Sequence, residues 1–310
     1  MKIIKAYTKG FGRTLSSYKM VSVIYFITLI LGLTITIPFR NTLKKAIGHS
    51  LIPEKLLYGF NFTIFEDFIR NNGKVMLPFL QIIFWVGIVY LLFTVFFAGG
   101  ILNIFYNERN KFSMQSFFEG CGKYFLRFFR LMIFTFLLNF IFILITYLPL
   151  GLIFSFLENS HLSERTLFYI GSAGVLFHFF LIGLSLIISD YAKIEIVIND
   201  TQKVFKTFWQ SVKFTIKHFF EVYALYLMLL IFPFLLFAIY YYIDKSFTMT
   251  SAKTILSMFL IQQIIIWLKL FSKVWFYKSE LSYYKNHIKD KQEEGKEFLD
   301  LKDMINPHEI

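Results

Sequence analysis

Residues 190–220 read DYAKIEIVIND TQKVFKTFWQ SVKFTIKHFF, an acidic end to a hydrophobic run followed by a basic, aromatic segment. From residue 204 apolar side chains recur at steps of three and four residues, with lysines between them: Val204, Phe205, Phe208, Trp209, Val212, Ile216, Phe219 and Phe220. This spacing predicts an amphipathic helix. Because the next hydrophobic run begins at once, we expect this helix to lie in the headgroup layer of a membrane.

The same pattern occurs twice earlier in the chain, in residues 3–18 and 116–130, each directly before a hydrophobic run. Aligning Gly10, Gly120 and Gln210 brings the three segments into phase. We therefore predict three repeats, each a basic amphipathic interfacial helix followed by a helical hairpin. The alternative is that any basic helix beside a membrane span has this composition without being a repeat.

The composition excludes an ordinary soluble domain. Hydrophobic residues make up 56% of the 310 and charged residues 17%, whereas a soluble domain carries about 25% charged residues. The net charge of +12 comes from basic residues that flank the apolar runs, so we expect anionic membrane lipids as partners and no nucleic acid. The single cysteine, Cys121, excludes an internal disulfide and a zinc cluster.

Six apolar runs approach or exceed the length of about 20 residues that crosses a bilayer. We predict an all-α polytopic membrane helix bundle with spans near residues 20–38, 75–106, 131–157, 166–189, 222–243 and 254–277. Residues 190–200 should continue the fourth span as a helix. Residues 1–285 should form the membrane domain, and residues 286–310 a polar cytoplasmic tail. From residue 278 we expect the chain to leave the membrane as a short helix that frays.

The distribution of lysine and arginine predicts the topology. Most of the 32 basic residues fall on one side of the six spans. By the positive-inside rule, both termini are cytoplasmic and the chain is a multi-pass protein of the cytoplasmic (inner) membrane.

Ionisable side chains deep inside a span usually mark a functional site, because burying them in lipid is costly. The predicted spans hold no aspartate, glutamate or arginine well inside, and His178 is the one titratable side chain near mid-span. This argues against a transporter driven by protons or sodium. Together with Asn139 and Gln262, His178 could form a polar seam in the centre of the bundle, although hydrogen bonds between helices are the simpler explanation.

The acidic residues before the basic helix are expected to form salt bridges with nearby lysines: Asp190, Glu195 and Asp200 with Lys193, Lys203 or Lys213. The sequence contains no phosphate-binding glycine loop, no HExxH pair, no GxSxG elbow and no CxxC pair. We therefore expect no catalytic residues, no metal and no cofactor. The pair Gly99 and Gly100 inside a span is typical of close helix packing or of a kink.

Three stretches carry a resemblance to known proteins: FFAGG at residues 96–100, FFEGCGKYFLRFFR at 117–130 and SDYAKIEIVINDTQKVFKTFWQSVKFTIKH at 189–218. In these stretches the chain resembles a broad group of uncharacterised prokaryotic six-span membrane proteins. The group includes the membrane domain that precedes the catalytic barrel of some glycerophosphodiester phosphodiesterases. No such barrel follows residue 277, so the resemblance implies a lipid-associated membrane setting and carries over no catalytic residues.

The leading hypothesis is a non-catalytic inner-membrane protein that serves as a lipid-interacting scaffold or as a subunit of a membrane protein partner. Basic residues at equivalent repeat positions are the candidates for binding lipid phosphates: Arg13, Lys123, Arg127, Lys213 and Lys217. Setting the topology is the other explanation for them. The main alternative function is a transporter or flippase for a lipid or amphiphile, using the seam of His178, Asn139 and Gln262.

Overall fold

The computed structural model describes residues 2–47, 62–107, 112–157, 163–247 and 251–305. Within these residues the elements are α1 (Lys2–Leu15), α2 (Tyr18–Ile47), α4 (Phe62–Tyr106), α5 (Met114–Leu157), α6 (Glu164–Asn199), α7 (Val204–Lys217), α8 (Phe219–Ser246) and α9 (Ala252–Ile305). Six of them, α2, α4, α5, α6, α8 and α9, are long and apolar enough to cross a membrane. The predicted all-α chain with six long apolar helices is confirmed.

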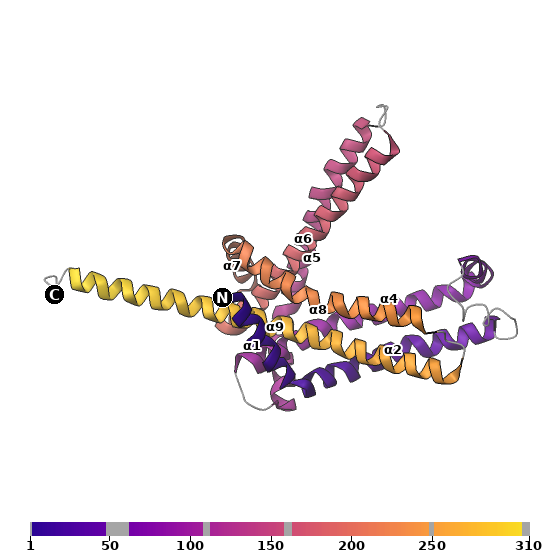
Figure 1. The fold of residues 1–310 in the computed structure, drawn as a ribbon, viewed down its shortest axis with the longest axis horizontal. Coiled ribbons are helices and arrows are strands. Elements are labelled where there is room, and N and C mark those ends of the chain that lie inside the picture. The colour runs from indigo at the N-terminus through magenta and orange to yellow at the C-terminus, as the bar shows by residue number, and fades with distance from the viewer. Residues whose placement is uncertain (1, 48–61, 108–111, 158–162, 248–250, 306–310) are drawn as a thin grey trace.

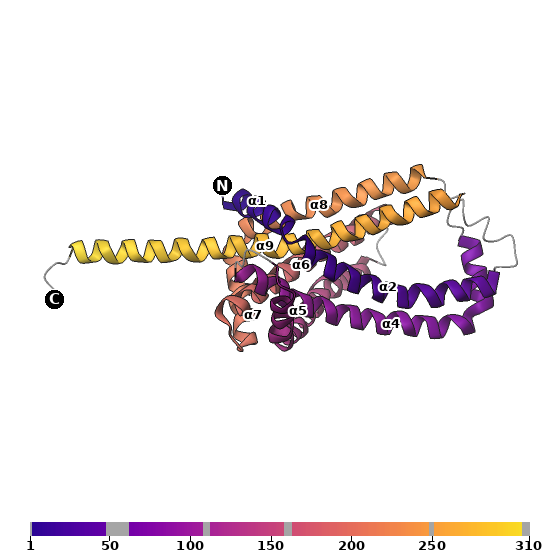
Figure 2. The ribbon, with the colours of Figure 1, turned by 90° about the horizontal axis from the view of Figure 1, so that it is seen from below.

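The helices meet in one region, which we call the hub; the last part of α9 projects from one side of it (Figure 1). The hub contains α1, α7, the C-terminal ends of α4 and α6, the starts of α2, α5 and α8, and the middle of α9. Its most deeply buried large side chains include Met20, Phe105, Phe117, Phe128, Tyr191 and Tyr283. From the hub α5 and α6 leave as a pair that diverges from the other four long helices (Figure 1), which run in roughly the same direction (Figure 2).

Outside the hub, many large apolar side chains of the long helices are exposed, among them Phe84, Phe140, Leu176 and Phe234. In a bilayer this exposure costs little, because lipid tails are as apolar as the side chains themselves. The hydrophobic residues of the long helices therefore face the surroundings, and the packed core of the molecule is concentrated at the hub.

Several helices extend beyond the ends of the predicted spans. α4 begins at Phe62 and not near residue 75, and α9 runs on past residue 277 to Ile305. α5 is one helix from Met114, so the basic segment 116–130 is its first part and not a separate interfacial helix. The reason is physical: charged residues mark where an apolar run ends, whereas the backbone hydrogen bonds of a helix continue through them. As expected, residues 190–199 continue α6.

The part of α9 after residue 277 is a central element of the hub and does not begin a fraying tail. Lys278, Ser279, Glu280, Leu281 and Tyr283 are all buried. Because α1, α4 and α6 all contact α9, these residues meet protein on several sides. Their polar composition gave the false expectation of a solvated helix.

Candidate functional site: the hub and its outer surface

Each of the three basic segments buries a row of small side chains at four-residue steps. The rows are Ala6, Gly10 and Thr14 in α1, Ser116 and Gly120 in α5, and Thr207, Ser211 and Thr215 in α7. The row in each segment packs on a long helix: the α1 row on the middle of α9, the α5 row on the C-terminal end of α4 and the α7 row on α6. Small residues let two helix backbones approach closely, which is how helices associate in membranes. The buried rows align Gly10 and Gly120 with Ser211, one residue away from the predicted partner Gln210, which is exposed.

α4 and α5 approach each other closely. A Cβ atom added to Gly100 would lie 2.5 Å from Cys121 Sγ and 2.7 Å from the Phe117 ring, and one added to Gly120 would overlap Asn103. The amide of Asn103 donates a hydrogen bond to the carbonyl of Ser116 at 3.0 Å. The prediction that Gly99 and Gly100 mark close helix packing is thus confirmed.

An ion-pair cluster ties the end of α6 to the start of α5. Asp200, the residue after α6, has a left-handed backbone with φ of 42°. Its carboxylate lies 2.8 Å from Lys123 Nζ and 2.6 Å from Arg127 Nη1. The Lys123 and Arg127 side chains hold the pKa of the Asp200 carboxyl below its ordinary value, because both hydrogen-bond to its charged form. Two of the five predicted lipid-binding cations are therefore already paired within the chain.

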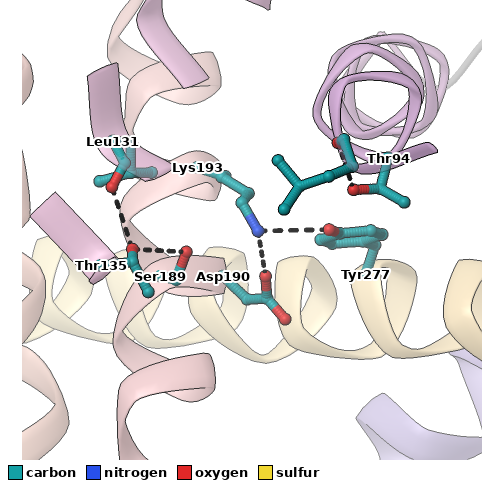
Figure 3. Close-up of polar contacts among 8 residues, drawn as sticks. Thr94, Leu131, Thr135, Ser189, Asp190, Lys193 and Tyr277 are labelled. Carbon is teal, nitrogen blue, oxygen red and sulfur yellow. Dashed lines mark hydrogen bonds and ion pairs between the residues drawn. The ribbon is translucent and has the colours of Figure 1, made fainter. Parts of the chain in front are cut away.

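A second ion pair lies deeper, facing α4 and α9 (Figure 3). Lys193 Nζ donates to Asp190 Oδ1 at 2.7 Å and to the hydroxyl of Tyr277 on α9 at 3.4 Å. On the other side, Thr135 of α5 donates to Ser189 Oγ at 3.2 Å. The expected salt bridge between Asp190 and Lys193 is confirmed, and these contacts link α5, α6 and α9 at a single level.

The remaining acidic residues of this region bind hydroxyl groups. Glu195 accepts from Ser211 at 3.2 Å, so α6 and α7 are joined through their buried faces. Glu221 at the start of α8 accepts from the hydroxyl of Tyr283 on α9. Glu195 therefore forms no ion pair with a lysine among the described residues, contrary to the expected salt bridge, and neither does Asp200 with Lys203 or Lys213.

Lysines of α9 satisfy the last carbonyl groups of α4. Lys278 Nζ lies 3.4 Å from the carbonyl oxygen of Phe105, and Lys285 Nζ lies 3.1 Å from that of Tyr106. The last carbonyls of a helix have no partner within the helix and carry a partial negative charge, which a cation stabilises. α4 can therefore end inside the protein without leaving these acceptors unsatisfied.

Glu280 is the exception in this network. Its side chain is 1% exposed, and neither carboxylate oxygen has a hydrogen-bond partner within the described residues. Its electrostatic neighbours include Asp190 and Lys193. Spacing alone gave no reason to single out Glu280, because it follows the last predicted span.

α7 presents a distinct outward face, which we call the α7 surface: Phe205, Lys206, Trp209, Lys213, Ile216 and Lys217. The three apolar side chains are 67%, 54% and 64% exposed, in chain order, and the three lysines are exposed as well. They share one side of the helix because Thr207, Ser211 and Thr215 occupy the other. Lys213 and Lys217 form no hydrogen bond or ion pair in the described part of the chain.

The five predicted phosphate-binding residues thus separate into groups. Lys123 and Arg127 pair with Asp200, whereas Lys213 and Lys217 belong to the exposed α7 surface. Arg13 is half-buried near the end of α1 and interacts with other groups of the protein. The five residues therefore do not form one common site, although their role in binding lipid stays a prediction.

The predicted polar seam is divided between two hairpins. Asn139 Oδ1 accepts from Ser185 Oγ at 2.9 Å, and the ring of His178 lies 5.1 Å from that of Tyr147, all between α5 and α6. Gln262 instead donates to Tyr240 at 3.1 Å, between α8 and α9. Because these hairpins diverge (Figure 1), the three side chains do not meet. Helix-to-helix hydrogen bonding accounts for Asn139 and Gln262.

Within the described residues, no three His, Cys, Asp or Glu side chains are placed to hold a metal ion. The thiol of Cys121 is buried in the contact between α4 and α5. Comparison of the chain with protein-family models, with curated proteins and with solved structures finds no match. The resemblance to the membrane domain of phosphodiesterases therefore stays an expectation, and what is established is an integral membrane protein by its six long apolar helices.

Proposed function

We propose that this protein is a non-catalytic, lipid-interacting scaffold of the inner membrane, which docks on anionic lipid headgroups through its α7 surface. In this proposal the hub lies at the cytoplasmic leaflet, and both termini are cytoplasmic. The excess of lysine and arginine at the hub end supports this orientation.

The observation that carries the proposal is the composition of the α7 surface. A row of exposed apolar side chains, Phe205, Trp209 and Ile216, runs beside a row of lysines. Aromatic groups favour the boundary between acyl chains and headgroups, and lysines are attracted to anionic phosphates. α8 begins two residues after α7 ends, so α7 is held at the level where a span enters the bilayer.

The contacts made by the other basic side chains of the hub support a scaffold and not an enzyme. Lys123, Arg127 and Lys193 are engaged by carboxylates, and Lys278 by a backbone carbonyl. Apart from the Lys193–Asp190 pair, which lies within α6, these contacts join segments that are far apart in sequence, and they support a role in fixing the hub. Lys213 and Lys217 differ because their side chains are exposed and lack such contacts in the described residues.

The test is to purify the protein in mild detergent and to identify co-purifying lipids by mass spectrometry. The variant is Lys213→Gln with Lys217→Gln. The matched control is Lys245→Gln with Lys253→Gln. It removes the same charge from exposed residues at the ends of α8 and α9 that lie away from the hub. We expect the first variant to lose anionic lipid and the control to retain it. Equal lipid content in wild type and both variants would refute docking through α7.

A second candidate function is transport of a lipid or amphiphile, as a transporter or flippase. One observation favours it: a small, mainly apolar cavity of about 20 Å³ lies between α2, α4 and α9, with Lys273 in its wall. Reconstitution in vesicles distinguishes the two functions. A transporter would move a labelled anionic phospholipid between leaflets faster than protein-free vesicles do, whereas a scaffold would not change that rate.

A further inference from the structure

Glu280 lies in the interior of the hub, on the part of α9 that contacts α6. Its side chain is 1% exposed, and its neighbours Ser279 and Leu281 are fully buried. Neither carboxyl oxygen has a hydrogen-bond partner within the described part of the chain. Buried polar groups in proteins are nearly always hydrogen-bonded, so a carboxyl group in this state calls for an explanation.

The charges around Glu280 do not balance. Asp190 and Lys193 of α6 are the charged groups that act on it among the described residues. The ammonium group of Lys193 is already engaged, because it lies 2.7 Å from Asp190 and donates to the hydroxyl of Tyr277 at 3.4 Å (Figure 3). The cluster therefore contains two carboxyl groups and one cation, and that cation is paired with Asp190.

The other elements packed against this part of α9 do not supply a second cation to Glu280. Lys278 directs its ammonium group to the carbonyl of Phe105 at the end of α4, at 3.4 Å. From α1, Gly10 packs against Ser279 and brings no charged side chain of its own. The remaining titratable groups that act electrostatically with Glu280 are phenols, which carry no charge near neutral pH: Tyr191 of α6, Tyr226 of α8 and Tyr277 of α9.

A buried carboxylate without a cation or a hydrogen-bond donor is far more costly than the neutral carboxylic acid in the same place. A single proton would remove the excess negative charge of the cluster. We propose that Glu280 binds a proton in the folded hub and that this proton makes the contact between α6 and α9 sensitive to pH. The proposal does not depend on lipid docking through the α7 surface or on the orientation of the protein in the membrane.

Loss of the proton would leave two buried carboxylates beside one ammonium group. Separation of α9 from α6 would then become more favourable, because water could solvate the second carboxylate. The folded protein thus binds one proton that the unfolded chain releases, so its stability should fall as pH rises.

The first experiment detects the proton directly. Infrared spectra of the full chain at neutral pH, in an alkyl maltoside detergent that has no carbonyl group, should contain the C=O stretch of a protonated carboxylic acid. The band should shift in D₂O, which distinguishes it from the ester bands of residual lipid. It should disappear in Glu280→Gln and persist in the matched control Glu119→Gln, which replaces an exposed glutamate of the hub. In wild type it should also disappear when dodecyl sulfate unfolds the protein at the same pH, and this measurement needs no variant.

The second experiment measures the linkage between the proton and folding. Glutamine resembles the neutral acid but cannot ionise, so Glu280→Gln should lack the pH dependence that Glu280 causes. Above the unfolded-state pKa of about 4.3, the folding equilibrium constant of wild type should fall about tenfold per pH unit relative to that of Glu280→Gln. From about pH 5.5 to 7.5 the two proteins should therefore diverge about a hundredfold. Glu119→Gln should follow the wild-type profile.

Three results would overturn the proposal. The first is the absence from folded wild type of any carboxylic acid band that is lost in Glu280→Gln or on unfolding. The second is a pair of parallel stability profiles for wild type and Glu280→Gln. The third is a loss of wild-type stability when sodium and potassium are replaced by a bulky organic cation, with no such loss in Glu280→Gln, because a metal ion would then compensate the carboxylate in place of the proton.

Discussion

The contact between α4 and α5 predicts that alanine substitutions of two glycines, which lie two residues apart, have opposite effects on stability. A Cβ atom added to Gly120 would lie 2.8 Å from Cγ of Asn103 and closer still to its Cβ, which is fixed to the backbone of α4. A Cβ atom added to Gly122 would meet nothing within 4 Å. Gly120→Ala should therefore push the two helices apart, whereas Gly122→Ala should be accommodated.

The size of the effect follows from comparing the two variants. Alanine favours a helix over glycine by about 1 kcal/mol, and this gain is common to both substitutions because both lie in α5. Overpacking a close contact costs about 1–3 kcal/mol. We expect Gly122→Ala to be up to about 1 kcal/mol more stable than wild type, and Gly120→Ala to be about 1–3 kcal/mol less stable than Gly122→Ala.

Two measurements test this expectation. Unfolding of the purified protein in mixed micelles with increasing dodecyl sulfate, followed by circular dichroism, gives the difference in the free energy of unfolding. Cys121, the single cysteine, reports on the same contact because its thiol is buried against Gly100. Maleimide should label it about tenfold faster in Gly120→Ala for each 1.4 kcal/mol lost. Equal stability of the two variants, with equal protection of Cys121, would refute the close approach of α4 and α5.

Two further predictions concern the ion pairs of the hub. Lys193→Met leaves Asp190 without its cation and should destabilise the protein by about 2 kcal/mol, while the double variant Asp190→Asn, Lys193→Met should recover most of this loss in the same unfolding assay; no recovery would show that the pair is not coupled. Asp200→Asn keeps a residue that tolerates the left-handed backbone and should cost about 0.2–1 kcal/mol for each partly exposed pair with Lys123 and Arg127. Because the folded-state pKa of Asp200 is lowered, its stabilisation is present above the unfolded-state pKa of about 3.9 and is lost as pH falls through the lower folded-state value. Unfolding measured against pH should therefore lose part of its acid dependence in Asp200→Asn, and an unchanged profile would contradict this assignment.

The long helices were predictable because apolar runs interrupted by charge are a strong signal along the chain. The ends of these helices were not predictable. In the sequence, Lys278 and Glu280 indicate the start of a solvated tail, whereas in the structure they are buried where α1, α4 and α6 contact α9. The amphipathic pattern of residues 204–217 correctly indicated a helix, but it did not distinguish the face in contact with protein. In membranes small side chains mark that face, so Ser211 and not Trp209 is buried.

Contacts between distant segments were the other source of error. The spacing of Asp190 and Lys193 on one helix made their ion pair predictable. Asp200 instead pairs with Arg127, which is 73 residues away in the sequence, and no local pattern indicates such a partner. Likewise, the sequence left open whether Asn139 and Gln262 meet in a polar seam, and the divergence of the hairpins keeps them apart.

The uninterrupted length of α9 makes it a mechanical lever. Its 54 residues extend for about 80 Å at 1.5 Å per residue. Its close contact with α1, where Gly10 meets Ser279, lies near the midpoint and would be the fulcrum if the helix tilted as a rigid rod. A tilt about this fulcrum would move the two ends through similar distances in opposite directions. Changes in bilayer thickness acting on the outer half of α9 would thereby become displacements of the far end, which projects beyond the hub (Figure 1).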